Sequence, residues 1–214
     1  ITPVNEFSPV FTSLSSVSFA ENGTGTVIDV NATDADLPAQ TLTFSITGGA
    51  DAAKFAINAS TGIVTSVSRR EVEKRTYVGG DNIYNLQVTA SDGSLSSSQS
   101  IAVTVTAVNE FAPVFTSAVT ANFAENGSGT VLTVQATDAD LPAATLSYSI
   151  TGGVDAAKFA INTSTGALTF VSSPNFEAPT DSGANNVYNV QVTASDGTNS
   201  TNQALAITVT AVND

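Results

Sequence analysis

Hydrophobic and polar residues alternate along several short runs of this chain. In TLTFSIT, residues 41–47, Leu42, Phe44 and Ile46 fall on one face, and Thr and Ser fall on the other. The run IYNLQVTA at residues 83–90 alternates in the same way. A period of two residues is typical of a strand that buries one face, so these runs predict half-buried β-strands.

The alternating runs occur twice, because the chain contains an internal repeat. TLSYSIT, VYNVQVTA and LAITVTAV repeat three runs of the first half. PVNEFSPVF opens the chain, AVNEFAPVF lies at residues 107–115, and AVND closes it, so that Asn5, Asn109 and Asn213 are evenly spaced. Aligned without gaps, the halves are roughly two-thirds identical. The repeat predicts two domains, residues 1–108 and 109–214.

Turn residues separate the alternating runs, and no segment has sustained helical periodicity. The clusters ENGTG, ITGGAD and SDG are rich in residues that accept positive φ. Each unit has about seven predicted strands and the length of a small sandwich domain. We therefore expect an all-β chain made of two tandem Greek-key (Ig-like) seven-stranded β-sandwiches arranged end to end.

Composition excludes several classes of function. The formal net charge is −13, which argues against nucleic acid and anionic membranes as partners and suits divalent cations. The chain has no His, Cys, Met or Trp, so zinc sites and thiol or imidazole catalysis are excluded, and no enzyme is expected. No apolar run is long enough to span a membrane, and no signal peptide is visible. We interpret the chain as a piece of a longer array.

The acidic residues occur mostly in turns. ATDADLP contains Asp34 and Asp36, and the same heptapeptide returns with Asp138 and Asp140. Carboxylates two positions apart repel each other, and they are tolerated in water or around a cation. The Asp-x-Asp pair alone therefore leaves two interpretations open, solvated turn acids and a metal site.

Several motifs occur in the same order in both halves. They are EN, ATDAD, STG, a glutamate, ASDG and VNE followed by APVF or SPVF. In this order they resemble the cadherin repeat over nearly the whole chain, in wording most similar to bacterial cadherin-like tandem repeats of large surface or secreted proteins. The resemblance implies a calcium-binding, calcium-stiffened module of the extracellular space or cell surface, with no direct insertion into a membrane.

The resemblance implies calcium (Ca2+) where one repeat meets the next. The first repeat would supply its early glutamate and the acids before its sixth strand, the linker an amide and a carboxylate, and the second repeat three aspartates. Calcium takes about 6–8 oxygen ligands, which this set can offer. The implied ligands are Glu21, Glu71, Glu73, Asn109, Glu110, the Phe111 backbone oxygen, Asp138, Asp140 and Asp196.

Two further sites are expected from the resemblance, each with part of the ligand set. A partial N-terminal site would use Asn5, Phe7, Asp34, Asp36 and Asp92. An incomplete C-terminal site would use Glu125, Glu177 and Asp214.

The chain also departs from the family pattern. Ala107 stands where the family linker commonly has an aspartate, and Phe111 stands where it has an asparagine, so the central family site has fewer ligands here. Unit 1 carries the basic run RREVEKR, in which Arg69, Arg70, Lys74 and Arg75 are expected in a solvated loop, with a partner-binding patch as the less favoured alternative.

Three classes of function are weighed. The first is a rod-like spacer or cell-adhesion module, whose partners would be neighbouring repeats of the same chain and a second copy in homotypic adhesion. The alternative is a calcium-dependent module that binds carbohydrate (polysaccharide), disfavoured because the chain has no Trp and four Tyr, of which only Tyr77 is expected to be exposed. The third, an enzyme, is rejected. We expect a bacterial extracellular protein.

Overall fold

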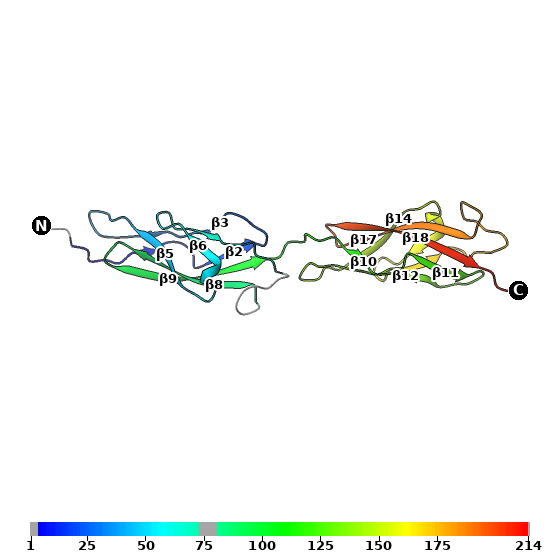
Figure 1. The fold of residues 1–214 in the computed structure, drawn as a ribbon, viewed down its shortest axis with the longest axis horizontal. Coiled ribbons are helices and arrows are strands. Elements are labelled where there is room, and N and C mark those ends of the chain that lie inside the picture. The colour runs from blue at the N-terminus through cyan, green and yellow to red at the C-terminus, as the bar shows by residue number, and fades with distance from the viewer. Residues whose placement is uncertain (1–3, 73–80, 214) are drawn as a thin grey trace. The chain divides into compact units, whose positions relative to one another are not determined.

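The structure is a computed structural model that describes residues 4–72 and 81–213. The chain divides into two compact units, residues 1–108 and 109–214, which are described separately below. Both units consist of β-strands, as Figure 1 shows, and each has one single-turn 3₁₀ helix. The all-β prediction is confirmed, and the segment DAAKF of unit 1 contains the 3₁₀ helix η1 (Ala52–Lys54).

Unit 1 is a sandwich of two sheets. One sheet has four strands in the order β2-β9-β8-β5, and the other has three in the order β3-β7-β6. The short strands β1 and β4 form a separate antiparallel pair. The strands are β1 (Val10–Phe11), β2 (Ser16–Ala20), β3 (Thr26–Asp29), β4 (Ala32–Thr33), β5 (Thr43–Gly48), β6 (Phe55–Ile57), β7 (Ile63–Ser66), β8 (Ile83–Ser91) and β9 (Ser96–Thr106).

Unit 2 repeats this topology. Its sheets have the orders β11-β18-β17-β14 and β12-β16-β15, and β10 pairs with β13. The elements are β10 (Val114–Phe115), β11 (Thr120–Ala124), β12 (Thr130–Thr133), β13 (Ala136–Thr137), β14 (Ser147–Gly152), η2 (Ala156–Lys158), β15 (Phe159–Ile161), β16 (Ala167–Phe170), β17 (Val187–Ser195) and β18 (Ser200–Thr210). The seven strands of the two larger sheets match the predicted Greek-key sandwich.

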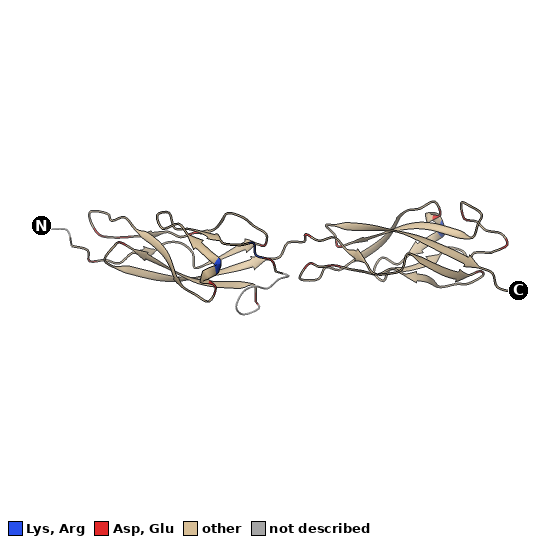
Figure 2. Ribbon diagram, in the orientation of Figure 1, with Lys and Arg blue, Asp and Glu red and all other residues tan. Residues whose placement is uncertain are grey.

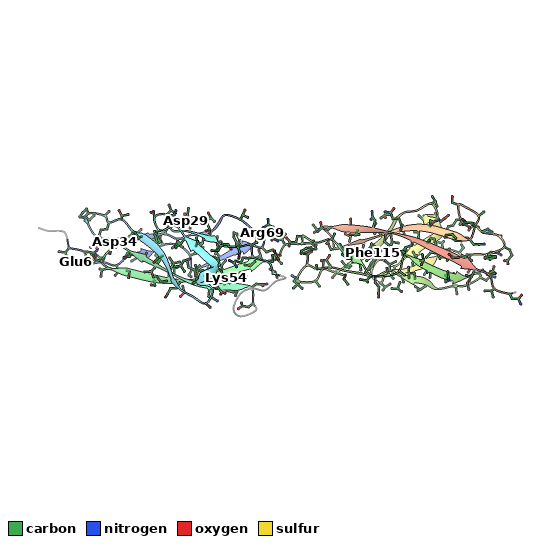
Figure 3. All side chains as sticks on the ribbon, viewed as in Figure 1. Glu6, Asp29, Asp34, Lys54, Arg69 and Phe115 are labelled. Carbon is green, nitrogen blue, oxygen red and sulfur yellow. The ribbon has the colours of Figure 1, made fainter. Side chains whose placement is uncertain are left out.

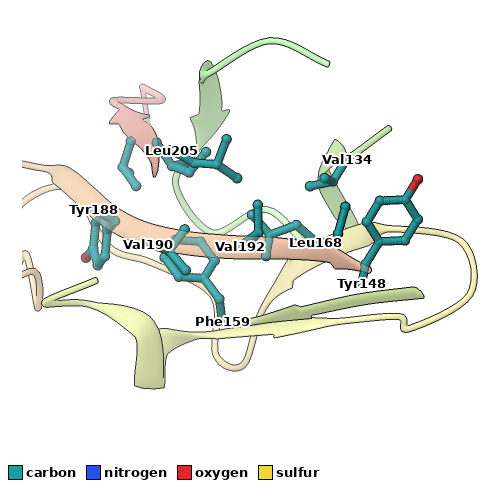
Figure 4. Packing of buried hydrophobic residues seen from close by; sticks show 11 residues of the cluster. Val134, Tyr148, Phe159, Leu168, Tyr188, Val190, Val192 and Leu205 are labelled. Atoms are coloured by element: carbon teal, nitrogen blue, oxygen red, sulfur yellow. The ribbon is translucent and has the colours of Figure 1, made fainter. Parts of the chain in front are cut away.

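Alternation places the apolar side chains between the sheets. In β8, the predicted inward residues Tyr84, Leu86 and Val88 are all buried, and their neighbours are more exposed. The core of unit 2 is built on the same rule, with Tyr188 and Val190 of β17 packed among the residues that Figure 4 labels. The alternation of apolar and polar residues therefore decides which face of each sheet packs against the other sheet.

A glycine at the turn before β7 lets two strands approach closely. Gly62 has φ +74°, and a Cβ atom built on it would lie 2.0 Å from the Val30 backbone oxygen. Gly166 occupies the same position in unit 2, with φ +69° and Val134 as its neighbour. Any other residue would clash with the backbone here, so the STG motif is a requirement of the fold.

One basic residue of the RREVEKR run lies in the core, contrary to the sequence-based prediction of a solvated loop. Arg70 is 2% exposed, and its guanidinium carbon lies 5.5 Å from the ring centroid of Phe55 and 5.1 Å from that of Tyr84. It donates to Ser66 Oγ and to the Lys54 backbone oxygen. The prediction was wrong because aromatic faces and two acceptors replace water around this cation. Arg69 is exposed, and Lys74, Arg75, Glu73 and Tyr77 lie outside the described residues.

The acidic side chains are concentrated outside the strands. Figure 2 shows most of the Asp and Glu positions in loops and at strand ends, whereas the sheets are almost uncharged. In the described part of the chain, no helix is long and apolar enough to cross a membrane. The polar chemistry of both units therefore lies in the loops at their ends.

Candidate metal sites

Each unit brings three aspartates together at its N-terminal end. In unit 2, Asp138 and Asp140 follow β13, and Asp196 follows β17 in the turn before β18. One carboxylate oxygen from each lies within 4.8 Å of the others. The equivalent residues of unit 1, which are Asp34, Asp36 and Asp92, form the same group. The predicted aspartates of both N-terminal ends therefore do converge, two from one loop and one from another.

Backbone amides hold the first and third aspartates of each group by one oxygen. Asp138 Oδ1 accepts the N–H of Asp140 at 2.9 Å, and Asp196 Oδ1 accepts the N–H groups of Thr198 and Asn199, both at 2.6 Å. The second oxygen, Oδ2, of both aspartates is buried and has no hydrogen-bond partner within the described residues. These turns fix the carboxylates and leave one oxygen of each directed into the group.

In unit 1 the two oxygens of the first and third aspartates differ in the same way. Asp34 Oδ1 accepts the Asp36 N–H at 2.9 Å, and Asp92 Oδ1 accepts the N–H groups of Ser94 and Leu95 at 2.7 and 2.8 Å. Again Oδ2 of Asp34 and of Asp92 is buried without a hydrogen-bond partner among residues 4–72 and 81–213. A buried, unpartnered carboxylate oxygen is costly, and its presence four times in equivalent positions needs an explanation.

The middle aspartate of each group holds the segment that leads into the unit. Asp140 is 4% exposed and accepts the backbone N–H groups of Glu110 and Phe111. Asp36 is 5% exposed and does the same for Glu6 and Phe7. Figure 3 labels Glu6 and Asp34 at the same end of unit 1. The phrase VNEF is therefore tied to the Asp-x-Asp loop through its backbone.

Hydrogen bonds keep the turn aspartates ionised. In Asp92 the backbone N–H groups of Leu95 and Ser94 are the main cause that lowers the pKa of the carboxyl group. In Asp196 burial raises the pKa, but hydrogen bonds from the backbone N–H groups of Asn199 and Thr198 lower it overall. At neutral pH both groups present full negative charge to their surroundings.

The predicted asparagine ligands have different neighbours in the two units. The Asn5 side-chain nitrogen donates to Gln40 Oε1 at 2.9 Å, and its Oδ1 is buried with no hydrogen-bond partner in the described part of the chain. Asn109 Oδ1 instead accepts from Asn199 Nδ2 at 2.8 Å. Neither Gln40 nor Asn199 was predicted as a site residue. Comparing the two halves at their non-identical positions would have found both, since Ala144 and Leu95 replace them.

The predicted glutamates lie at the C-terminal ends of the units. Glu21 is 2% exposed and accepts the N–H groups of Val72 at 2.6 Å and Val108 at 2.5 Å. Glu125, equally buried, accepts those of Phe176 and Val212, both at 2.8 Å. Each glutamate therefore joins a loop to the segment after the last strand. This is a structural role that the sequence did not predict.

The remaining predicted residues are placed as follows. Glu71 is half-buried near the C-terminal end of unit 1, Glu110 is exposed in the entry segment of unit 2, and the side chain of Glu177 interacts with that of Glu125. Glu73 and Asp214 lie outside the described residues. Within the described part, the two aspartate groups are the places where three acids converge.

The donor set of the aspartate groups fits a hard divalent cation. Each group offers oxygens of three carboxylates, and the chain has no histidine nitrogen or cysteine sulfur to add to them. Calcium is bound by such oxygens, and oxygens around one ion at the usual distances would be spaced as these are. The buried Oδ2 atoms of the first and third aspartates are the atoms that such an ion would satisfy.

Comparison with known proteins places both units in one family. The cadherin domain model matches residues 15–108 and 119–211. Protocadherin Fat 4 of Mus musculus is 34% identical over 223 residues, which cover 99% of this chain and 4% of that protein. Halomucin of Haloquadratum walsbyi is 41% identical over 71 residues, which cover 32% of this chain and 1% of that protein. The chain thus spans a small fraction of the length of these relatives.

Solved structures have the same fold. The extracellular cadherin domains 3–6 of protocadherin gamma B2 superpose with a TM-score of 0.78 at 24% identity, over 99% of this chain and 55% of that one. The fold of each unit, the internal sequence repeat and the match to the cadherin domain model all indicate the same family. The chain belongs to the cadherin domain family, a family of non-enzymatic modules, and consists of two tandem repeats of it.

Proposed function

We propose that each repeat binds calcium at its aspartate group, and that the chain is a calcium-ordered extracellular module of a longer repeat protein. One observation carries the proposal. In both units two aspartates are held by one oxygen through backbone N–H groups, while their second oxygen is buried without a hydrogen-bond partner in the described residues. A bound cation would offset the repulsion among three carboxylates and satisfy those oxygens.

Binding would order the segments that enter the repeats. Asp140 already holds the backbone of Glu110 and Phe111, and Asp36 holds that of Glu6 and Phe7. A cation shared by the aspartates and the asparagine of the VNEF phrase would add a second attachment for the same segment. Stiffening of the chain by calcium, as in a spacer between other domains, would follow from this attachment.

Calorimetric titration of the whole chain with calcium tests the proposal. Asp34→Asn and Asp138→Asn keep the Oδ1 acceptor of each loop but remove its charge. Each variant should lose one binding event or weaken it at least tenfold, and the double variant should bind no calcium at millimolar concentration. Asp29→Asn is the matched control, because Asp29 is an exposed acid outside both groups. Equal titrations of control and site variants would refute the proposal.

A further arm tests the predicted sharing of ions between repeats. It stays a prediction that unit 1 supplies ligands to the ions of unit 2. The ligands from unit 1 would be Glu21, Glu71 and Glu73, and the aspartates of unit 2 would be Asp138, Asp140 and Asp196. Neutralising Glu71 and Glu73 together as glutamines, in the Asp34→Asn background, should weaken the remaining calcium site. Unchanged affinity would show that each repeat binds its ion alone.

Adhesion is the finer functional proposal. Several relatives are protocadherins, and one solved structure of the same fold is a cis-dimer of protocadherin gamma B7. We extend this to homotypic pairing of the present chain, on a bacterial or other cell surface. Beads coated with the chain should aggregate in calcium and disperse in chelator. The carbohydrate-binding alternative gains no support from the relatives, and Tyr84, Tyr148 and Tyr188 are buried and offer no stacking surface.

A further inference from the structure

The side chain of Asn199 makes contacts at the aspartate group of unit 2 that have no counterpart in unit 1. Its Nδ2 atom donates to Asn109 Oδ1 at 2.8 Å and to the Phe111 backbone oxygen at 3.1 Å. Both acceptors are oxygens that the sequence predicts as metal ligands. The amide nitrogen of Asn199 is therefore bonded to two of the oxygens that a cation would need.

The backbone of Asn199 is bonded to the third aspartate of the group. Asp196 Oδ1 accepts the backbone N–H of Asn199 at 2.6 Å. The side-chain –NH₂ group of Asn199, which carries partial positive charge, is thus bonded to an amide oxygen and a carbonyl oxygen, while its backbone N–H binds the carboxylate.

The residues around the equivalent asparagine of unit 1, Asn5, are different. Leu95 takes the place of Asn199 and has no side-chain donor. Gln40 takes the place of Ala144 and accepts from Asn5 Nδ2 at 2.9 Å, so Asn5 is oriented by its nitrogen. Asn5 Oδ1 then remains buried with no hydrogen-bond partner among the described residues. The side-chain oxygen of Asn5 in unit 1 is thus free to bind a cation, whereas the side-chain oxygen of Asn109 in unit 2 accepts a hydrogen bond from Asn199.

We propose that the Asn199 side-chain amide competes with calcium at the aspartate group of unit 2 and lowers the calcium affinity of that site. The inference rests on the proposed function. When calcium binds, the hydrogen bonds to Asn109 Oδ1 and Phe111 O are lost or weakened, and their loss opposes binding. In unit 1 the Gln40 contact leaves the ligand oxygen open, so no equivalent contact is broken.

Reciprocal exchange between the units tests this. Asn199→Leu, measured in the Asp34→Asn background so that only unit 2 binds, should tighten calcium binding roughly three- to tenfold, the equivalent of one net hydrogen bond. Leu95→Asn in the Asp138→Asn background should weaken the site of unit 1 by a similar factor. Weaker binding in Asn199→Leu would overturn the proposal, because it would make Asn199 a ligand or a support for one.

Behaviour without calcium separates competition from a general structural role. In chelator, Asn199→Leu should speed backbone hydrogen exchange at Glu110 and Phe111 and lower the melting temperature, because two ligand oxygens lose their donor. In saturating calcium the variant should melt no lower than the parent. Lower stability under both conditions with an unchanged dissociation constant would mean that Asn199 is only structural.

The experiment also distinguishes failure of the inference from failure of the proposed function. If the unmodified chain shows no calcium binding by calorimetry, the proposed function fails, and the competition with it. If the unmodified chain binds calcium but both exchanges leave the affinities unchanged, only the role of Asn199 is refuted. Asn202→Leu is the matched control, because the Asn202 side chain accepts a hydrogen bond from Thr193 Oγ1 within the sheet.

Discussion

At the scale of single residues, the two repeats use buried carboxylates for two different purposes. Asp36 and Asp140 bind the entering backbone and share a cluster with other acids. Glu21 and Glu125 bind two separate segments within their own units. Residue type and spacing could predict the aspartate clusters. The double contact of each glutamate could not be predicted, because it depends on where a distant loop returns.

Glu125 should make the stability of unit 2 sensitive to acid. The backbone N–H groups of Val212 and Phe176 lower the pKa of Glu125 below its usual 4.5. A lowered folded-state pKa gives stabilisation that is present above about pH 4.5 and is lost as the pH falls through the folded pKa. Urea unfolding between pH 3 and pH 7 should therefore depend less on pH in Glu125→Gln than in the parent chain, and the variant should be less stable at pH 7. Identical pH profiles would contradict this role.

At the scale of strands, the repeats fill one core position in two ways. In unit 1 the Arg70 guanidinium lies over Phe55 and Tyr84. In unit 2 the ring centroid of Phe170, at the end of β16, lies 4.5 Å from that of Phe159 and 5.1 Å from that of Tyr188. Alternation predicted the strands around this position. It could not predict that a cation from a loop would take the place of an aromatic side chain.

The two solutions should be exchangeable only as pairs. Ser66 and Arg70 in unit 1 correspond to Phe170 and Pro174 in unit 2. Ser66→Phe alone should create a steric clash with the Arg70 guanidinium, and Arg70→Pro alone should leave a cavity over Phe55 and Tyr84. Each single change should lower the free energy of unfolding, whereas the double change should recover about 1–2 kcal/mol of the summed loss. A double-mutant cycle by urea unfolding measures this coupling. Additive losses would show that the ring and the guanidinium do not share one position.

At the scale of the whole molecule, the repeat itself was the most informative feature of the sequence. The strands, the turn glycines and both aspartate groups occur twice in register, and the structure reproduces each of them in both units. The differences between the repeats were harder to interpret, because each is visible only as a substitution at one position. Leu95 against Asn199 and Gln40 against Ala144 acquire meaning once their neighbours in space are known.

Calcium should stabilise both repeats in a chain that has no cysteine and a net charge of −13. Extracellular calcium modules bind with dissociation constants of roughly 10⁻⁴–10⁻³ M, and one site at about 100 times its constant adds ~2.7 kcal/mol. That is a large share of the ~5–15 kcal/mol that a domain normally has. Thermal melts should therefore shift upward with the logarithm of calcium concentration. The Asp34→Asn, Asp138→Asn double variant should lose this shift, while sodium chloride at equal ionic strength should give the small, equal shift that screening produces in both proteins. If calcium raises the melting temperature of the double variant as much as that of the parent, general screening of acidic loops accounts for the effect, and the aspartate groups do not bind the ion.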